Sequence, residues 1–185
     1  MRHIARPTSD TGPVKLTVCA AAALALVCAP AANAEPPNFP DFTGFAVVTD
    51  SHGGLYQGGS QTIVAFVTPD GVRCGIYPLG GIGNSVRCHG SVPGLQGLGL
   101  SLDRSVDNPC DFGEATLRAA NPGVLTLVRG ACPTELVDAA PMAVGQQVRV
   151  GTTTCGVAAG DVTACYDKTG GGHGFVLQPA GSWSF

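Results

Sequence analysis

The sequence predicts a mainly β fold, a small antiparallel sandwich or half-open barrel built of disulfide-pinned hairpins. Short segments rich in β-branched and apolar residues alternate with turns rich in glycine and proline. No sustained helical period is present, and the one helix candidate, residues 135–139, is short. Cysteines lie on the arms of the predicted hairpins, which indicates that disulfides hold the sheets together.

The first 34 residues have the layout of a secretory signal peptide. Residues 1–15 are basic, residues 16–29 are apolar and uncharged, and Ala32-Asn33-Ala34 forms a small-x-small cleavage site. The apolar run is shorter than the roughly 20 residues that a membrane-spanning helix needs. We therefore expect cleavage after Ala34 and a secreted or cell-envelope protein with no transmembrane segment in the mature chain.

Two regions are expected after the signal peptide. Residues 35–60 form an extended arm followed by a glycine-rich loop, because residues 35–45 contain three prolines and three phenylalanines. We expect the phenylalanines to hold this arm against a sheet. Residues 61–185 form a single disulfide-stabilised β domain.

Six cysteines remain after the signal peptide, and an even number in an exported chain indicates three disulfides. Half a zinc site is the alternative for two cysteines in a hairpin. Zinc ligands usually come as Cys-x2–4-Cys, and no cysteine pair here is that close, so no metal is expected. The six residues are Cys74, Cys88, Cys110, Cys132, Cys155 and Cys165.

Hairpin geometry favours a connectivity that follows the order of the sequence. If Cys155 lies opposite Cys165 in an antiparallel pair, a three-residue loop containing Gly160 remains. Directly opposed Cα atoms are about 4.5–5.5 Å apart, and a disulfide needs about 4.4–6.8 Å. Cys74 and Cys88 repeat this pattern, with Cys-Gly-aliphatic before the turn and valine shortly before the second cysteine.

The third pair, Cys110 and Cys132, lies at the outer ends of another predicted hairpin, with a type II turn centred on Pro122-Gly123. Residues 62–67 form the strongest predicted strand, and their continuous apolar character predicts burial on both faces or a central position. Residues 50–60 and 89–98 are predicted loops. Further strands are predicted at residues 46–48, 72–77, 85–88, 99–102, 146–150 and 173–177.

The charge balance excludes some partners. Residues 35–185 keep 7 of the 10 basic and 12 of the 13 acidic side chains, so their net charge is about −5. The basic residues form no cluster, so nothing predicts nucleic acid or an anionic lipid surface as a partner. No cofactor is expected, since the glycines at 170–172 follow Lys168, the reverse of the P-loop order. A cell-wall component or a host protein is the candidate partner.

Three histidines, His52, His89 and His173, each lie beside a glycine in a predicted loop region. A histidine can act as a base or a metal ligand, and a hydrogen-bonded structural role is the alternative. His173 and His89 are the candidate binding residues, because glycines leave the backbone around His173 open. No Gly-x-Ser-x-Gly motif is present, so no catalytic residue is assigned.

Residues 68–74, 86–94, 154–157 and 173–177 read TPDGVRC, VRCHGSVPG, TCGV and HGFVL. Together they resemble a family of small exported mycobacterial and related actinobacterial proteins that contain cysteines. The resemblance covers roughly residues 66–185 and the signal-peptide layout. It implies export, cysteines at these positions and a C-terminal His-Gly-Phe strand. The family has no assigned activity, so the resemblance transfers no catalytic residue.

Three functions remain open from the sequence. A non-enzymatic binding module of the cell envelope or extracellular space fits a disulfide-stapled scaffold with glycine loops and no catalytic set. A secreted hydrolase that uses a loop histidine as its base is the second hypothesis. A protease inhibitor that presents a rigid loop at residues 91–98 is the third.

Overall fold

The structure is a computed structural model that describes residues 36, 38–48, 53–55, 62–96, 100–102, 110–118, 121–133 and 139–185. The chain divides into Met1–Ala31 and Ala32–Phe185, and every described residue belongs to the second unit. The predicted signal peptide, His52 and residues 135–138 of the helix candidate lie outside the described residues.

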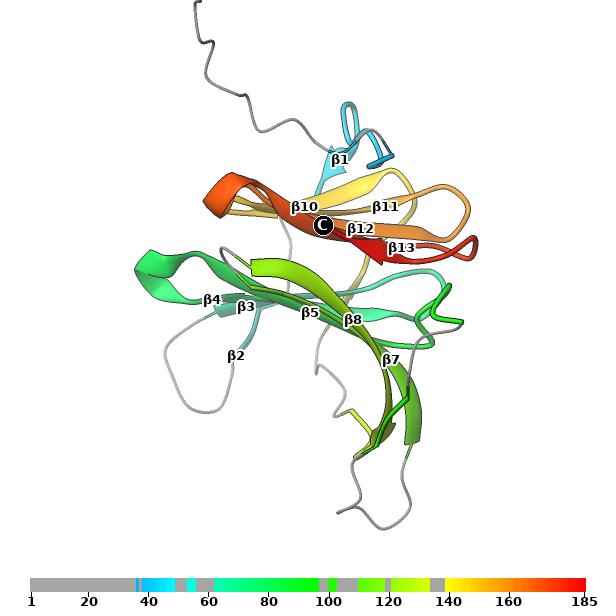
Figure 1. The fold of residues 1–185 in the computed structure, drawn as a ribbon. Helices are drawn as coiled ribbons and strands as arrows, with labels where there is room; N and C mark the ends of the chain where they lie inside the picture. Colours follow the sequence, from blue (N-terminus) through cyan, green and yellow to red (C-terminus); the bar gives the residue numbers. More distant parts are fainter. Residues whose placement is uncertain are drawn as a thin grey trace, which may run out of the picture. The chain divides into compact units, whose positions relative to one another are not determined.

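Two β-sheets face each other in the described part of the chain, which contains no α-helix (Figure 1). The sheets do not close into a barrel, so the mainly β prediction is confirmed in its sandwich form. The six-stranded sheet follows the order β1 (Ala46–Val47), β10 (Gln146–Val150), β11 (Thr153–Ala158), β12 (Val162–Asp167), β13 (His173–Leu177) and β14 (Trp183–Ser184).

The eight-stranded sheet contains the predicted strongest strand, β3, whose Ala65 and Phe66 are both buried although they point to opposite faces. Burial on both faces is therefore confirmed. The sheet follows the order β2 (Gly53–Leu55), β3 (Thr62–Val67), β4 (Arg73–Pro78), β5 (Asn84–Gly90), β7 (Cys110–Arg118), β8 (Asn121–Gly130) and β6 (Leu100–Leu102), and β9 (Ala140–Pro141) also pairs with β3.

All hairpin pairs are antiparallel, as predicted, but both sheets are mixed. The short strands β1, β9 and β6 pair in parallel with β10, β3 and β8. These parallel pairs join segments that are distant in sequence, so no turn motif signals them. Strands β1 and β2 bring residues 46–47 and 53–55 of the predicted arm region into the sheets.

The hydrophobic core lies between the two sheets and includes two of the three disulfides. Cys74 is opposite Cys88 in the eight-stranded sheet, and Cys155 is opposite Cys165 in the six-stranded sheet. Their Cα atoms are 4.0 Å and 4.1 Å apart. The core side chains around them include Phe66, Val72, Ile76, Val86, Leu117, Val148, Val157, Phe175 and Leu177.

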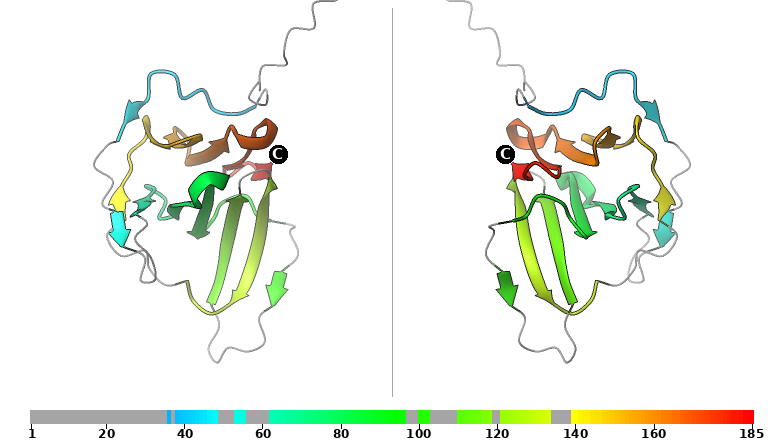
Figure 2. Two further views of the ribbon diagram at one scale, coloured as in Figure 1. Left: turned by 90° about the vertical axis from the view of Figure 1, so that its left-hand side faces the viewer. Right: turned by 90° about the vertical axis from the view of Figure 1, so that its right-hand side faces the viewer.

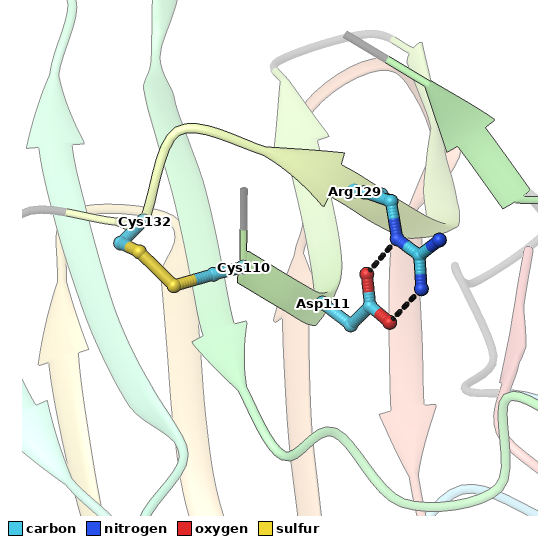
Figure 3. Close-up of polar contacts among 4 residues, drawn as sticks. All are labelled: Cys110, Asp111, Arg129 and Cys132. Carbon is cyan, nitrogen blue, oxygen red and sulfur yellow. Dashed lines mark hydrogen bonds and ion pairs between the residues drawn. A yellow bond between two sulfur atoms is a disulfide. The ribbon is translucent and has the colours of Figure 1, made fainter. Parts of the chain in front are cut away.

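The third disulfide joins Cys110 to Cys132 at the outer ends of β7 and β8, with Cα atoms 5.0 Å apart. It lies at the surface beside an ion pair between Asp111 and Arg129 (Figure 3). The sequential connectivity predicted from hairpin geometry is confirmed for all three pairs.

The predicted turn at Pro122-Gly123 is wrong, because both residues lie within β8. Arg118 of β7 pairs with Asn121 of β8, so the strand pairing already includes the residue before Pro122. A Cβ atom on Gly123 would lie 2.6 Å from the carbonyl oxygen of Gly174 in the other sheet. This glycine therefore permits a close approach between the sheets and does not form the turn.

Two predicted loops also contain strand residues. Gly53–Leu55 form β2 in the predicted loop 50–60. His89 and Gly90 extend β5 into the predicted loop 89–98, where His89 pairs with Arg73 on one side and Glu114 on the other. The backbone N–H and C=O groups of these residues can bond to strands on both sides, and this tertiary pairing outweighs the weak strand propensity of the local sequence.

Candidate ligand-binding groove

The phenylalanine-rich arm runs along the outer face of the six-stranded sheet, away from the eight-stranded sheet (Figures 1 and 2). Gln147 is only 2% exposed, and its side-chain amide donates to the carbonyl oxygens of Phe42 (3.2 Å) and Phe45 (3.0 Å). The Phe42 ring lies directly over Gly156, where a Cβ atom would be 2.8 Å from the ring. The prediction that the phenylalanines hold the arm against a sheet is confirmed.

Six of the chain's 11 aromatic residues form one contact chain on this face. We call them the aromatic cluster. Their neighbouring ring centroids are 5.1–6.1 Å apart, in the range of favourable aromatic pairs. The cluster joins the arm to the C-terminus, so two distant segments fix each other's position. Its members are Phe39, Phe42, Phe45, Tyr166, Trp183 and Phe185.

Beside this cluster, the arm and the sheet enclose a groove of about 290 Å³. Its floor is a row of outward-pointing residues on adjacent strands, since Arg149 pairs with Thr154 and Thr154 pairs with Tyr166. The arm forms one wall, and the β10–β11 turn with the residue after β12 forms the other. The charged and aromatic residues of the lining are Phe39, Asp41, Phe42, Arg149, Tyr166 and Lys168.

Two cations line the groove without an ion-pair partner among the described residues. The Nε of Arg149 donates to the side-chain oxygen of Gln147 at 3.0 Å, which fixes the base of the guanidinium. Lys168 is exposed. By contrast, Arg87 pairs with Glu114 and Arg129 pairs with Asp111, each at 2.5 Å.

Among the described residues, Asp41 supplies the one acidic side chain of the groove lining. Hydrogen bonds from the side chain and the backbone N–H of Thr43, the latter at 2.8 Å, hold the pKa of Asp41 below its ordinary value. The carboxylate therefore stays ionised at neutral pH. It forms no ion pair with either groove cation, so it remains an acceptor for a ligand donor.

A buried carboxylate, Asp167, holds the wall that carries Lys168. Burial alone would raise the pKa of Asp167, but hydrogen bonds from Thr153, Thr169 and Thr152 together outweigh burial and lower it. The Thr152 hydroxyl donates to this carboxylate at 3.1 Å, and the Thr169 N–H donates at 2.7 Å.

The same carboxylate is linked to the other sheet. Thr153 donates to Asp167 and accepts a hydrogen bond from the Asn84 side chain of β5 at 2.8 Å. Asn84 also donates to the backbone oxygen of Val150 at 2.7 Å. The groove wall is thus anchored through the core to the eight-stranded sheet.

The candidate histidines lie elsewhere. His89 is on β5 of the eight-stranded sheet, 7% exposed, and its Nε2 has no hydrogen-bond partner among the described residues. Burial, with repulsion from Arg87 and Arg73, lowers its pKa, so the ring is neutral at pH 7. His173 begins β13 opposite Asp167, half-buried. The structure does not bring these two histidines to the groove.

Sequence reasoning missed Asp41, Arg149 and Lys168 as site residues. One signal was available, since Lys168 is the only lysine after residue 34. Within the described ranges, no group of three or more His, Cys, Asp or Glu residues is placed to hold a metal ion. No helix among the described residues is long and apolar enough to cross a membrane.

Comparison with protein-family models, with curated proteins and with solved structures finds no match to this chain.

Proposed function

We propose that this protein is an exported, non-enzymatic binding module of the cell envelope or extracellular space, which holds a small polar ligand in the groove. The observation that carries the proposal is the groove itself, a hollow of about 290 Å³ with charged and aromatic walls. Its lining is mainly polar, which suits a polar ligand, and the few aromatic side chains add apolar contact.

The signal-peptide layout, three disulfides and the resemblance to exported mycobacterial proteins support export. The disulfides and the hydrogen bonds between the groove wall and the other sheet support a role in binding, because a rigid site loses little conformational entropy when a ligand binds. The hydrolase hypothesis needs a histidine that reaches a substrate. The burial of His89 gives that hypothesis no support.

Co-sedimentation with purified cell-wall material tests this proposal. The protein is produced from its full-length sequence in an exporting host and kept oxidised. We expect the wild type to be retained at physiological ionic strength. The Thr154→Trp variant, which fills the floor of the groove, should lose retention.

Thr126→Trp is the matched control, since Thr126 lies half-buried on β8 of the other sheet. It should bind like the wild type. Absence of wild-type retention, or equal retention of the Thr154→Trp variant, would contradict the proposal.

A further inference from the structure

We propose that the ligand of this groove is an acidic sugar, a sugar unit that carries a carboxylate or phosphate group. This inference rests on the proposed function and names the ligand class of the same site. Three features of the lining carry it: two cations without a described acidic partner, one ionised acceptor, and aromatic side chains in the same hollow.

The positive charges of Arg149 and Lys168 favour a ligand that carries an anionic group. The Nε of Arg149 is occupied by Gln147, which leaves the terminal nitrogens of the guanidinium as a fork of donors. Such a fork binds carboxylate or phosphate with two parallel hydrogen bonds. Lys168 lines the same hollow and adds a second positive charge. A cationic ligand would meet two like charges here, so the groove selects against it.

The remaining polar groups suit hydroxyls. Asp41 is ionised and lines the groove, and a carboxylate accepts hydrogen bonds from neighbouring hydroxyl groups. The Thr154 hydroxyl on the floor can both donate and accept. A ligand with hydroxyls and one anionic group uses the acidic and the basic residues together, whereas inorganic phosphate uses only the cations.

The aromatic side chains favour a ring. Phe39, Phe42 and Tyr166 line the groove, and the Phe39 and Tyr166 ring centroids are 5.7 Å apart. Tyr166 is only 3% exposed, so the half-buried rings of Phe39 and Phe42 offer the aromatic surface. The C–H groups of a sugar ring pack against such rings while its hydroxyls reach polar neighbours. The volume is at the small end of ligand pockets, which span about 300–1,000 Å³. The groove therefore accommodates a short segment of a glycan.

A nucleic acid backbone is a poorer fit. Its binding uses many cations along a track, and this groove offers two. The negative charge of the mature chain also opposes a long polyanion. A single anionic group within a hydroxyl-rich ligand matches the site better.

Calorimetric titration with four defined probes tests the inference. The probes are an oligogalacturonate, a neutral cello-oligosaccharide, glucose 6-phosphate and inorganic phosphate. We expect the oligogalacturonate or the sugar phosphate to bind at least tenfold more tightly than the neutral sugar and inorganic phosphate. The preferred acidic probe identifies whether carboxylate or phosphate is recognised. Added salt should weaken this binding because exposed charges are screened.

The Arg149→Gln/Lys168→Gln variant should lose about tenfold or more in affinity for the acidic probe. The matched control, Arg87→Gln/Arg129→Gln, removes the same number of charges from the other sheet and should bind like the wild type. Equal binding of neutral and acidic sugars, binding of inorganic phosphate alone, no binding of any probe, or equal effects of the two variants would overturn the inference.

Retention on cell-wall material separates this inference from the proposed function. If the wild type is retained and Thr154→Trp is not, but Arg149→Gln/Lys168→Gln is retained fully, the groove binds an envelope ligand that is not acidic. The proposed function then stands and the inference fails. If no envelope material retains the wild type, the proposed function fails, and the calorimetric titration still decides whether the groove binds acidic sugars.

Discussion

The two sheets of this sandwich differ in how their charged side chains are paired. On the eight-stranded sheet, Arg87 and Arg129 each pair with a carboxylate on an adjacent strand. On the six-stranded sheet, Arg149 and Lys168 line a groove and have no such partner among the described residues. Figure 3 shows the guanidinium of Arg129 facing both oxygens of Asp111.

This difference separates structural charge from charge available for recognition. A paired, exposed arginine has its preferred anion already and adds little to stability. The groove cations have no acidic partner among the described residues, and a bound anion would replace part of their hydration. The arm creates this asymmetry, because it covers the outer face of only the six-stranded sheet.

Reduction should have the largest effect and should separate the surface disulfide from the two core disulfides. Each disulfide stabilises a fold by about 2–4 kcal/mol, so complete reduction should unfold the protein at or below body temperature. Mild reductant should open Cys110–Cys132 first, because Cys132 is exposed whereas Cys155 and Cys165 are fully buried. Mass spectrometry of alkylated thiols would measure the order, and simultaneous labelling of all six cysteines would contradict it.

Alanine substitutions at Gly174 and Gly75, one in each sheet, should destabilise the protein to different extents. A Cβ on Gly174 would lie 2.5 Å from the backbone oxygen of Cys165, which cannot move without opening the β12–β13 pairing. The three atoms nearest to a Cβ on Gly75 all belong to the Tyr77 side chain, the first at 2.9 Å. We expect Gly174→Ala to cost about 3 kcal/mol or more and Gly75→Ala about 1 kcal/mol. Equal losses in urea unfolding would contradict this account.

Asp167→Asn should weaken the groove wall in a pH-dependent manner. The folded-state pKa of Asp167 lies below its ordinary value, so its ionised form stabilises the fold above about pH 4. That stability is lost as the pH falls through the lowered pKa. We expect the variant to lose about 1–3 kcal/mol at about pH 7 and the gap to the wild type to narrow at about pH 2.5. A gap of constant size in urea unfolding would refute this assignment.

Removal of the paired charges should have the smallest effect. Arg87→Gln/Arg129→Gln should leave thermal stability nearly unchanged, because exposed ion pairs contribute little. A clear drop in the melting temperature of this variant would show that the eight-stranded face depends on its charges.

Local pattern predicted the parts of the fold that depend on neighbours in sequence. Cys155, Gly160 and Cys165 define a hairpin within eleven positions, and the register follows from that spacing. The Pro122-Gly123 turn failed for the opposite reason. Gly123 is required by Gly174 in the other sheet, a contact that no local rule reports.

The candidate site was beyond sequence reasoning because its charged residues are far apart in the chain. Asp41 lines the same groove as Arg149 and Lys168 because two contacts hold the arm on the sheet. Strand β1 pairs in parallel with β10, and the Phe42 ring packs on Gly156. The histidines were predicted as binding residues because glycines flank them in the sequence. For His89 the prediction of a loop was wrong, because His89 and its neighbour Gly90 both lie in strand β5.

The location of the bound ligand decides whether the groove is the binding site. Titration of the ¹⁵N-labelled protein with the preferred acidic sugar, followed by amide chemical shifts, reports which face responds. We predict that the amide shifts of Thr154, Tyr166 and Lys168 at the groove change, and that those of Arg87 and Arg129 do not. Changes confined to the eight-stranded sheet, or none at saturating sugar, would contradict it.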